Sequence, residues 1–126
     1  MNVVDSSAWL EFFADGPNAD EFAAPLTDRG ALIVPSITIY EVFKVVCRQR
    51  GEDAALQAAA LMQQGGVVEL SPSQAMLAAK TSLEQALPMA DSVILATARL
   101  YHAVLWTQDE HFSSVSGVRY FPKRYK

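Results

Sequence analysis

Four acidic residues each stand where a predicted strand ends or where the following helix begins: Asp5, Glu41, Asp91 and Asp109. In an open α/β sheet the ligand crevice lies outside the carboxyl ends of the strands, so these side chains are expected to converge. Carboxylates about 4 Å apart repel by about 4 kcal/mol per pair at an effective dielectric near 20, unless cations or protons neutralise them. Oxygen ligands favour hard divalent cations, so the sequence predicts a Mg²⁺ or Mn²⁺ site.

Each acid taken alone also has a structural explanation. Asp5 is suited to cap a helix, Asp91 to stabilise the positive end of its own helix, and Asp109 to shape a turn. Glu41 is harder to explain in this way, because it lies in an apolar segment and a partly buried glutamate needs a partner. The joint occurrence of four acids at one sheet edge favours a catalytic site.

The elements that must position these acids are predicted from apolar periodicity and helix-end signals. Strands are expected at 2–5, 32–35, 67–70, 104–107 and 118–121. Helices are expected near 6–13, 18–28, 36–50, 53–64, 71–87 and 89–101, with Ser6 or Ser7 capping the first. Met62, Met76 and Met89 are expected to fill the core. The alternation predicts an α/β fold, with right-handed crossovers and a mostly parallel sheet covered by helices on both faces.

The composition indicates one folded domain over residues 1–126. Apolar residues make up 51% and charged residues 19%, which excludes a disordered chain and leaves apolar surface for a partner. The longest apolar stretch, near 93–98, is far shorter than the roughly 20 residues that a membrane span needs, so no membrane partner is expected. Cys47 is the only cysteine, which excludes an intrachain disulfide and fits a cytoplasmic location.

The net charge of −4 argues against a nucleic-acid partner only if charge is spread evenly. Without the four clustered acids, 10 of the 14 acidic residues remain against 10 basic ones. Lys44 and Arg48 follow Glu41 by three and seven positions, and are expected to contact phosphate or to form surface ion pairs. Arg99, two turns beyond Asp91, has the same two interpretations. A basic group also ends the chain: Arg119, Lys123, Arg124 and Lys126.

Four segments resemble the signature blocks of the PIN domain in order and spacing: NVVDSSAWLEFF, PSITIYEVFKVV, LPMADSVILATARL and VLWTQDEHF. The resemblance covers essentially the whole chain and is to the short VapC-type toxins of toxin-antitoxin pairs. It implies a PIN-like three-layer α/β/α sandwich with four to five strands. It also implies a metal-dependent endoribonuclease that cuts structured RNA such as tRNA or rRNA, is held inactive by a cognate antitoxin, and forms a homodimer.

The resemblance assigns roles to particular side chains. The metal-binding acids are Asp5, Glu41, Asp91 and Asp109; Thr107 supplies the hydroxyl before the last acid, and Ser6 is a supporting group. One or two Mg²⁺ ions lower the pKa of a bound water, orient it in line with a phosphodiester and stabilise the leaving oxygen. The three aspartates are assigned to coordination, directly or through water, and the glutamate either coordinates or orients the attacking water.

Two questions stay open at this point. Glu110 beside Asp109, and His111 close to it, leave undecided which side chains complete the site. The same acids also fit a non-catalytic module that binds a structural cation or a partner's arginine. A phosphotransfer domain with Asp5 as the nucleophile is disfavoured, because the expected Asp-x-Asp start is replaced by Asp5-Ser6-Ser7.

Overall fold

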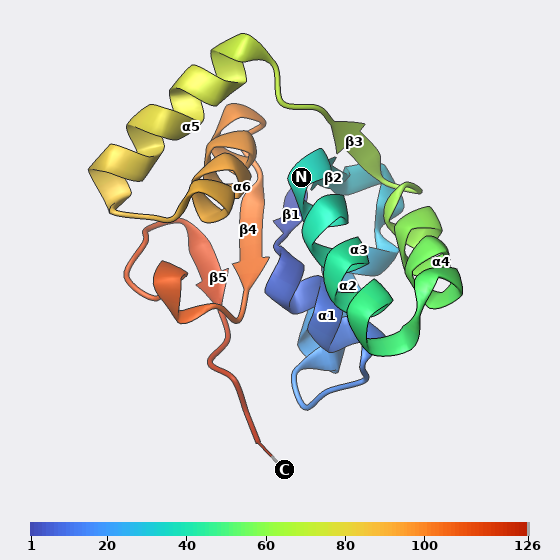
Figure 1. Ribbon diagram of the computed structural model, residues 1–126. Coiled ribbons are helices and arrows are strands. Elements are labelled where there is room, and N and C mark those ends of the chain that lie inside the picture. The colour runs from blue at the N-terminus through green and yellow to red at the C-terminus, as the bar shows by residue number, and fades with distance from the viewer. Residues whose placement is uncertain (126) are drawn as a thin grey trace.

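The computed structural model describes residues 1–125 and shows helices and strands in alternation (Figure 1). The strands are β1 (Asn2–Val4), β2 (Leu32–Pro35), β3 (Gly66–Val68), β4 (Val104–Thr107) and β5 (Val118–Tyr120). The α-helices are α1 (Ser6–Phe13), α2 (Ala19–Thr27), α3 (Ser36–Arg50), α4 (Glu52–Met62), α5 (Pro72–Gln85) and α6 (Met89–Leu100). Two short 3-10 helices, η1 (Arg29–Ala31) and η2 (Glu110–Phe112), complete the described elements.

The strands form one sheet in the order β3-β2-β1-β4-β5, with β1 at its centre. Every pairing is parallel, and Val3 lies opposite both Ile33 of β2 and Leu105 of β4. The expected sheet is therefore confirmed, and it is parallel throughout. The parallel arrangement brings the carboxyl ends of β1 and β4 together at one edge, next to the start of the helices that follow them.

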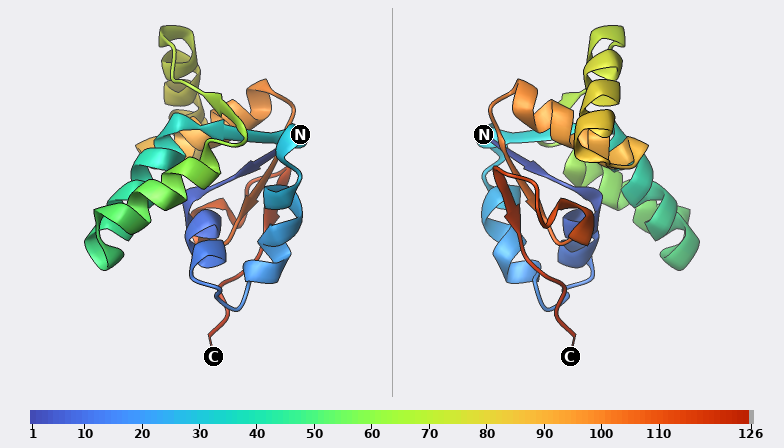
Figure 2. Two further views of the ribbon diagram at one scale, coloured as in Figure 1. Left: turned by 90° about the vertical axis from the view of Figure 1, so that its right-hand side faces the viewer. Right: turned by 90° about the vertical axis from the view of Figure 1, so that its left-hand side faces the viewer.

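Alternating strand residues divide the core into two layers. On one face, Val3, Ile33 and Leu105 pack against Ile94 and Leu95 of α6. On the other face, residues such as Val4 and Val34 pack against α1, α2, α3 and α4. Figure 2 shows α3 and α4 side by side as a helical hairpin that projects from the sheet. This three-layer α/β/α arrangement confirms the predicted fold.

Local signals set most element ends, with two corrections to the sequence-based expectations. The first helix is capped by Asp5 rather than by a serine, so β1 ends at Val4. Met62 is fully buried as expected, but Met76 is 65% exposed and Met89 is 74% exposed, so they do not fill the core. Among residues 1–125, no helix is long and apolar enough to cross a membrane.

Candidate metal centre

Asp5 occupies the turn between β1 and α1 and is the most enclosed acid of the group. Its Oδ1 accepts hydrogen bonds from the Ala8 backbone N–H at 3.0 Å and from Ser7 Oγ at 2.7 Å. The residue is only 2% exposed, and this burial raises the pKa of its carboxyl to about 7 despite the hydrogen bonds, which lower it. Asp5 is therefore a helix cap that is also poised to change charge near neutral pH.

Thr107 links Asp5 to Asp109 through one buried hydroxyl. It is the last residue of β4, and its Oγ1 donates to Asp5 Oδ2 at 2.6 Å. The same oxygen accepts the backbone N–H of Asp109 at 2.9 Å. Because β1 and β4 are adjacent and parallel, this contact fixes two acids that are more than a hundred positions apart in sequence. Thr107 thus connects the carboxyl ends of β1 and β4 beside the acids.

Glu41 reaches the group from the second turn of α3. Its Oε1 accepts a hydrogen bond of 2.5 Å from Ser6 Oγ on α1. Partial burial raises the pKa of Glu41, and the nearby negative charges of Asp91 and Asp109 raise it further, whereas the Ser6 bond lowers it. The serine therefore links the Glu41 carboxylate on α3 to the start of α1.

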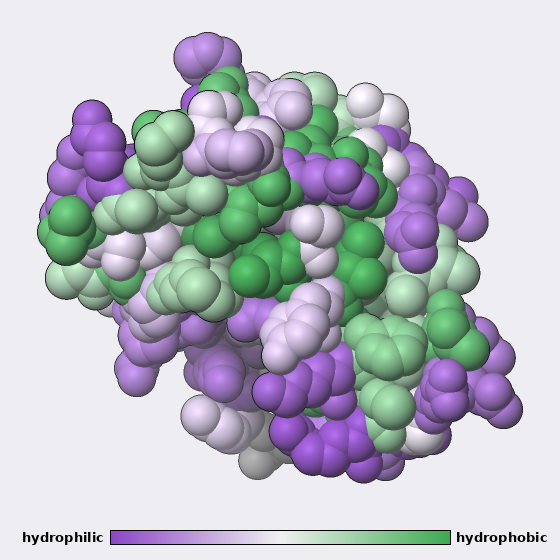
Figure 3. Space-filling model, turned by 45° about the horizontal axis from the view of Figure 1, so that its top comes forward, coloured by the Kyte–Doolittle hydropathy of each residue, from purple (hydrophilic) through white to green (hydrophobic). Residues whose placement is uncertain are grey.

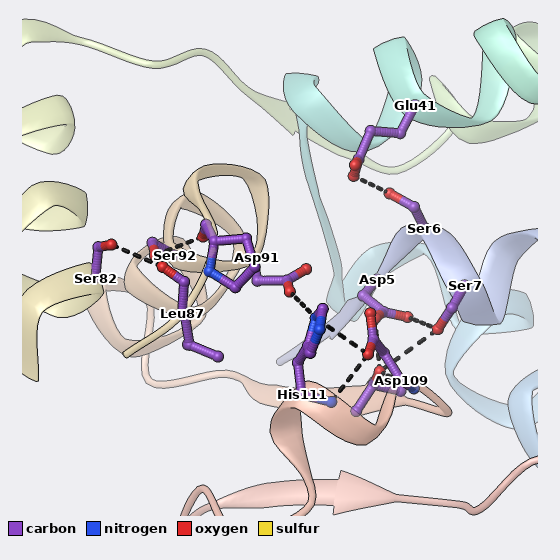
Figure 4. A network of polar contacts seen from close by, with 12 residues as sticks. Asp5, Ser6, Ser7, Glu41, Ser82, Leu87, Asp91, Ser92, Asp109 and His111 are labelled. Atoms are coloured by element: carbon purple, nitrogen blue, oxygen red, sulfur yellow. Dashed lines mark hydrogen bonds and ion pairs between the residues drawn. The ribbon is translucent and has the colours of Figure 1, made fainter. Parts of the chain in front are cut away.

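Asp91 lies in the first turn of α6, and His111 lies between it and Asp109 (Figure 4). His111 Nδ1 is 2.8 Å from Asp91 Oδ2 and 3.4 Å from Asp109 Oδ1. The Asp109 carboxylate also accepts the backbone N–H of His111 at 2.9 Å. Partial burial raises the pKa of Asp91, while the hydrogen bond from His111 lowers it; the same bond raises the pKa of His111. The imidazole thus joins two of the predicted ligands.

The charges of this group are not balanced by lysine or arginine. Within residues 1–125, the only ion pairs involving its members are those between His111 and the two aspartates. Figure 4 shows the side chains of Glu41, Asp91 and Asp109 directed into one space beside the start of α1. Like charges gathered in this way without a lysine or arginine partner favour binding of a cation.

The donor atoms fit a divalent cation. Asp91, Asp109 and His111 each offer one atom, and these atoms lie within 4.8 Å of one another. Ligands bonded to Mg²⁺ at about 2.1 Å stand about 3 Å apart at adjacent octahedral positions, which is close to the observed separations. Asp5 and Glu41 lie outside this set of three, and their carboxylates accept hydrogen bonds from Ser7, Thr107 and Ser6.

The basic residues that the sequence predicts as phosphate contacts do not gather around the acids. Lys44 and Arg48 are exposed on α3, where they line an apolar groove with Tyr40 and Phe43. Arg99 is not brought to the carboxylates. It lines a pocket with Ser116 and other residues near the start of β4, about 12 Å along the helix axis from the first turn of α6. Helix α6 therefore carries its acid and its arginine at opposite edges of the sheet.

The sequence alone leaves the role of His111 open and indicates only a capping role for Ser7. His111 stands two residues after a predicted ligand, and the 3-10 turn that follows Asp109 brings its side chain back to the acids. Ser7 does not cap the helix but donates to the cap residue Asp5. The structure also separates Asp109 from Glu110, because only Asp109 belongs to the ligand set.

A parallel α/β sheet with a cluster of carboxylates at its carboxyl edge defines a class of α/β proteins whose ligands bind in the crevice at that edge. A family comparison narrows this class. The PIN domain model matches residues 3–118, so the chain belongs to the PIN domain family. The comparison with curated proteins gives no match.

Solved structures show the same fold. A toxin-antitoxin complex from Klebsiella pneumoniae is 21% identical, with a TM-score of 0.77 over 94% of this chain and 95% of that chain. The sarcin-ricin loop cleaving toxin VapC20 of Mycobacterium tuberculosis is 17% identical, with a TM-score of 0.77 over 94% of this chain and 98% of that one. VapBC from Salmonella typhimurium bound to DNA is 16% identical, with a TM-score of 0.70 over 97% of this chain and 98% of that chain.

Proposed function

We propose that this PIN domain is a metal-dependent endoribonuclease that acts as the toxin of a toxin-antitoxin pair. The observation that carries the proposal is the convergence of Asp5, Glu41, Asp91 and Asp109 at one sheet edge without a lysine or arginine partner. Family membership supports it, as do neighbours described as a sarcin-ricin loop cleaving toxin and as a toxin-antitoxin complex. The nuclease forms one domain and acts in the cytoplasm on structured RNA.

Asp91, Asp109 and His111 hold the cation in this proposal, joined by Asp5 and Glu41 directly or through water. A bound Mg²⁺ or Mn²⁺ lowers the pKa of a water molecule and stabilises charge at the cleaved phosphodiester. Glu41 orients the attacking water, because its Oε2 is left free by the single hydrogen bond from Ser6. Thr107 keeps the Asp5 carboxylate aligned with Asp109.

The test is cleavage of purified tRNA and rRNA with Mg²⁺, with Mn²⁺ and with a chelator, followed by mapping of the new 5′ ends. Discrete cuts that require metal and vanish in Asp109→Asn support the proposal. The exposed Asp28 provides a matched control, and Asp28→Asn is expected to cleave normally. Stabilisation by Mg²⁺ without any cleavage would instead identify a non-catalytic metal-binding module.

We also propose that a cognate antitoxin binds the groove along α3. This groove, of about 650 Å³, is lined by apolar side chains including Tyr40 and Phe43, with Lys44 and Arg48 at its rim. Its chemistry fits an apolar segment that carries acidic residues. Because the same two basic residues are proposed RNA contacts, a bound antitoxin competes with the substrate. Tyr40→Asp is expected to lose the antitoxin in co-purification from cells that express both proteins, whereas Leu56→Asp on α4 keeps it.

A homodimer is proposed through the outer face of α5 and α6. Leu83 is 86% exposed and Met89 is 74% exposed, and both line an apolar groove of about 510 Å³. Figure 3 shows apolar residues gathered in a band across the face seen from the top of Figure 1. Pairing of this face with a second copy removes such side chains from water.

Sedimentation velocity tests the homodimer. Leu83→Asp is expected to convert the protein to monomers, while the matched variant Leu56→Asp, at a leucine that is 53% exposed, leaves the dimer intact. A wild-type chain that sediments as a monomer at all concentrations would contradict the proposed dimer without affecting the nuclease proposal.

A further inference from the structure

A cavity of about 520 Å³ adjoins the carboxylates on the side of β5. Asp109 and His111 belong to its lining, together with Tyr120 at the end of β5 and with Lys123 and Tyr125 of the segment that follows. Pockets of this size hold small ligands. A ligand in this cavity therefore lies directly beside the proposed cation-binding atoms.

The segment after β5 that lines this cavity is held in place by side-chain hydrogen bonds. Buried Asn18 donates from Nδ2 to Pro122 O at 2.9 Å and to Gln108 Oε1 at 3.1 Å. Its Oδ1 accepts from Arg124 Nε at 2.6 Å, and the guanidinium also donates to Pro17 O. This part of the lining is thus formed before any ligand arrives. Lys126 of the basic terminus lies outside the described residues.

The distribution of charge orients a ligand within this cavity. Lys123 is the one lysine or arginine among its described lining residues, and it also lines a second cavity of about 320 Å³ together with Arg50. Glu110 lies at the end near the carboxylates. A phosphate is therefore favoured near Lys123, where the two cavities share residues, and disfavoured near Glu110.

The aromatic residues complete the chemistry. Tyr125 is 86% exposed, so its ring is open to stack on a flat ligand, and Tyr120 is a half-buried residue of the same lining. Unpaired RNA bases stack on such rings, whereas paired bases in an A-form helix cannot. Two tyrosines and a lysine in one lining thus match one nucleotide of a single-stranded segment.

We infer that this cavity binds one unpaired nucleotide of the RNA substrate, beside the phosphodiester at the metal centre. Lys123 contacts its phosphate, and Tyr120 and Tyr125 contact its base. The inference rests on the proposed ribonuclease function for the identity of the ligand. It explains how a chain of net negative charge holds RNA close to a cluster of acids.

The test is the binding of fluorescein-labelled single-stranded oligoadenylate to full-length protein, measured by fluorescence anisotropy at several salt concentrations. All proteins carry Asp91→Asn, which is expected to prevent cleavage and replaces no residue of the cavity lining. Tyr125→Ala is expected to weaken binding by at least about fivefold, with Tyr125→Phe close to the parent. Lys123→Ala is expected to weaken binding and to lower the salt slope by about 0.7.

Matched controls are Lys80→Ala on α5 and Tyr101→Ala at the end of α6, which change exposed residues outside the cavity. If Lys123→Ala and Tyr125→Ala bind oligoadenylate as these controls do, the inference is overturned. Cleavage by the protein without Asp91→Asn is measured separately. If the protein cleaves RNA in a metal-dependent way but the cavity substitutions do not change binding, the nuclease proposal stands and the inference about the cavity is wrong. If the cavity substitutions weaken binding but the protein does not cleave RNA, the nuclease proposal is wrong and the cavity still binds a nucleotide.

Discussion

Replacement of Asp5 by asparagine is expected to stabilise the metal-free protein at alkaline pH. Asp5 is almost completely buried, and its carboxyl has a pKa of about 7 instead of 3.8. An acid with a raised pKa favours the folded state when it is protonated and disfavours it when it is ionised. Asparagine has the shape of the protonated acid and carries no charge at any pH. The substitution therefore removes an ionisation that works against folding.

The magnitude follows from the pKa of Asp5. Each pH unit between the folded and unfolded pKa values corresponds to about 1.4 kcal/mol, so full ionisation of Asp5 lowers the free energy of unfolding by about 4 kcal/mol. The contribution of the protonated Asp5 carboxyl to the free energy of unfolding is fully present below pH 3.8 and is lost as the pH rises through about 7. Rearranged hydrogen bonds to Ser7 and Thr107 in the variant offset part of the gain.

Urea unfolding in the presence of chelator, repeated from pH 4 to pH 9, measures the effect. The wild type is expected to lose stability across the window between 3.8 and about 7, and Asp5→Asn is expected to lose much less. Asp28→Asn serves as the control at an exposed acid and is expected to follow the wild type. Added Mg²⁺ at pH 8 is expected to stabilise the wild type more than Asp5→Asn, because a bound cation favours the ionised carboxylate.

Two results would refute the reasoning. One is an Asp5→Asn protein that is less stable than the wild type at pH 8 without metal. The other is a pair of pH profiles that run parallel across the whole range. Either result would mean that Asp5 is ionised at little energetic cost, and that its carboxylate does not need a cation.

Three further outcomes are expected. Ser6→Ala removes the hydrogen bond that lowers the pKa of Glu41, so the acidic limb of the pH dependence of kcat/KM is expected to move to higher pH. Ser6→Thr is expected to keep the acidic limb in place, and identical limbs in the two variants would contradict this role of Ser6. His111→Ala is expected to reduce the affinity for Mn²⁺ more than the affinity for Mg²⁺ in calorimetry, because an imidazole ligand suits Mn²⁺ better than Mg²⁺. Equal losses of affinity for the two ions would argue against coordination of the cation by His111. Arg124→Ala is expected to speed amide hydrogen exchange in the segment after β5 while changing the free energy of unfolding by only about 1 kcal/mol. An unchanged exchange rate would show that Asn18 alone holds this segment in place.

Much of the fold was predictable because periodicity and helix-end signals agreed along the chain. The helix at 36–50 and the strands at 32–35 and 104–107 have the predicted bounds. The exposed methionines were not predictable, because a single sequence gives the helical face of Met76 or Met89 but not whether another element of the chain covers it. The helix-capping role of Asp5 was one of the alternatives, and the structure shows that the same residue also belongs to the acid cluster.

The site was predictable as a set of acids but not as a geometry. Strand ends and helix starts placed Asp5 and Asp91 at one sheet edge, which topology alone implies. The place of His111 depended on a 3-10 turn that no periodic signal announces. The position of Arg99 depended on which way α6 runs, because a helix antiparallel to the strands carries its last turn to the far edge of the sheet.

The bond from Thr107 to Asp5 joins the second half of the chain to its first strand across a sequence separation of 102. A chain emerging from the ribosome therefore cannot bring Asp5 and Asp109 together until β4 has docked beside β1. The proposed metal centre is thereby among the last parts of the molecule to form, and an unfinished copy that lacks β4 has no such centre.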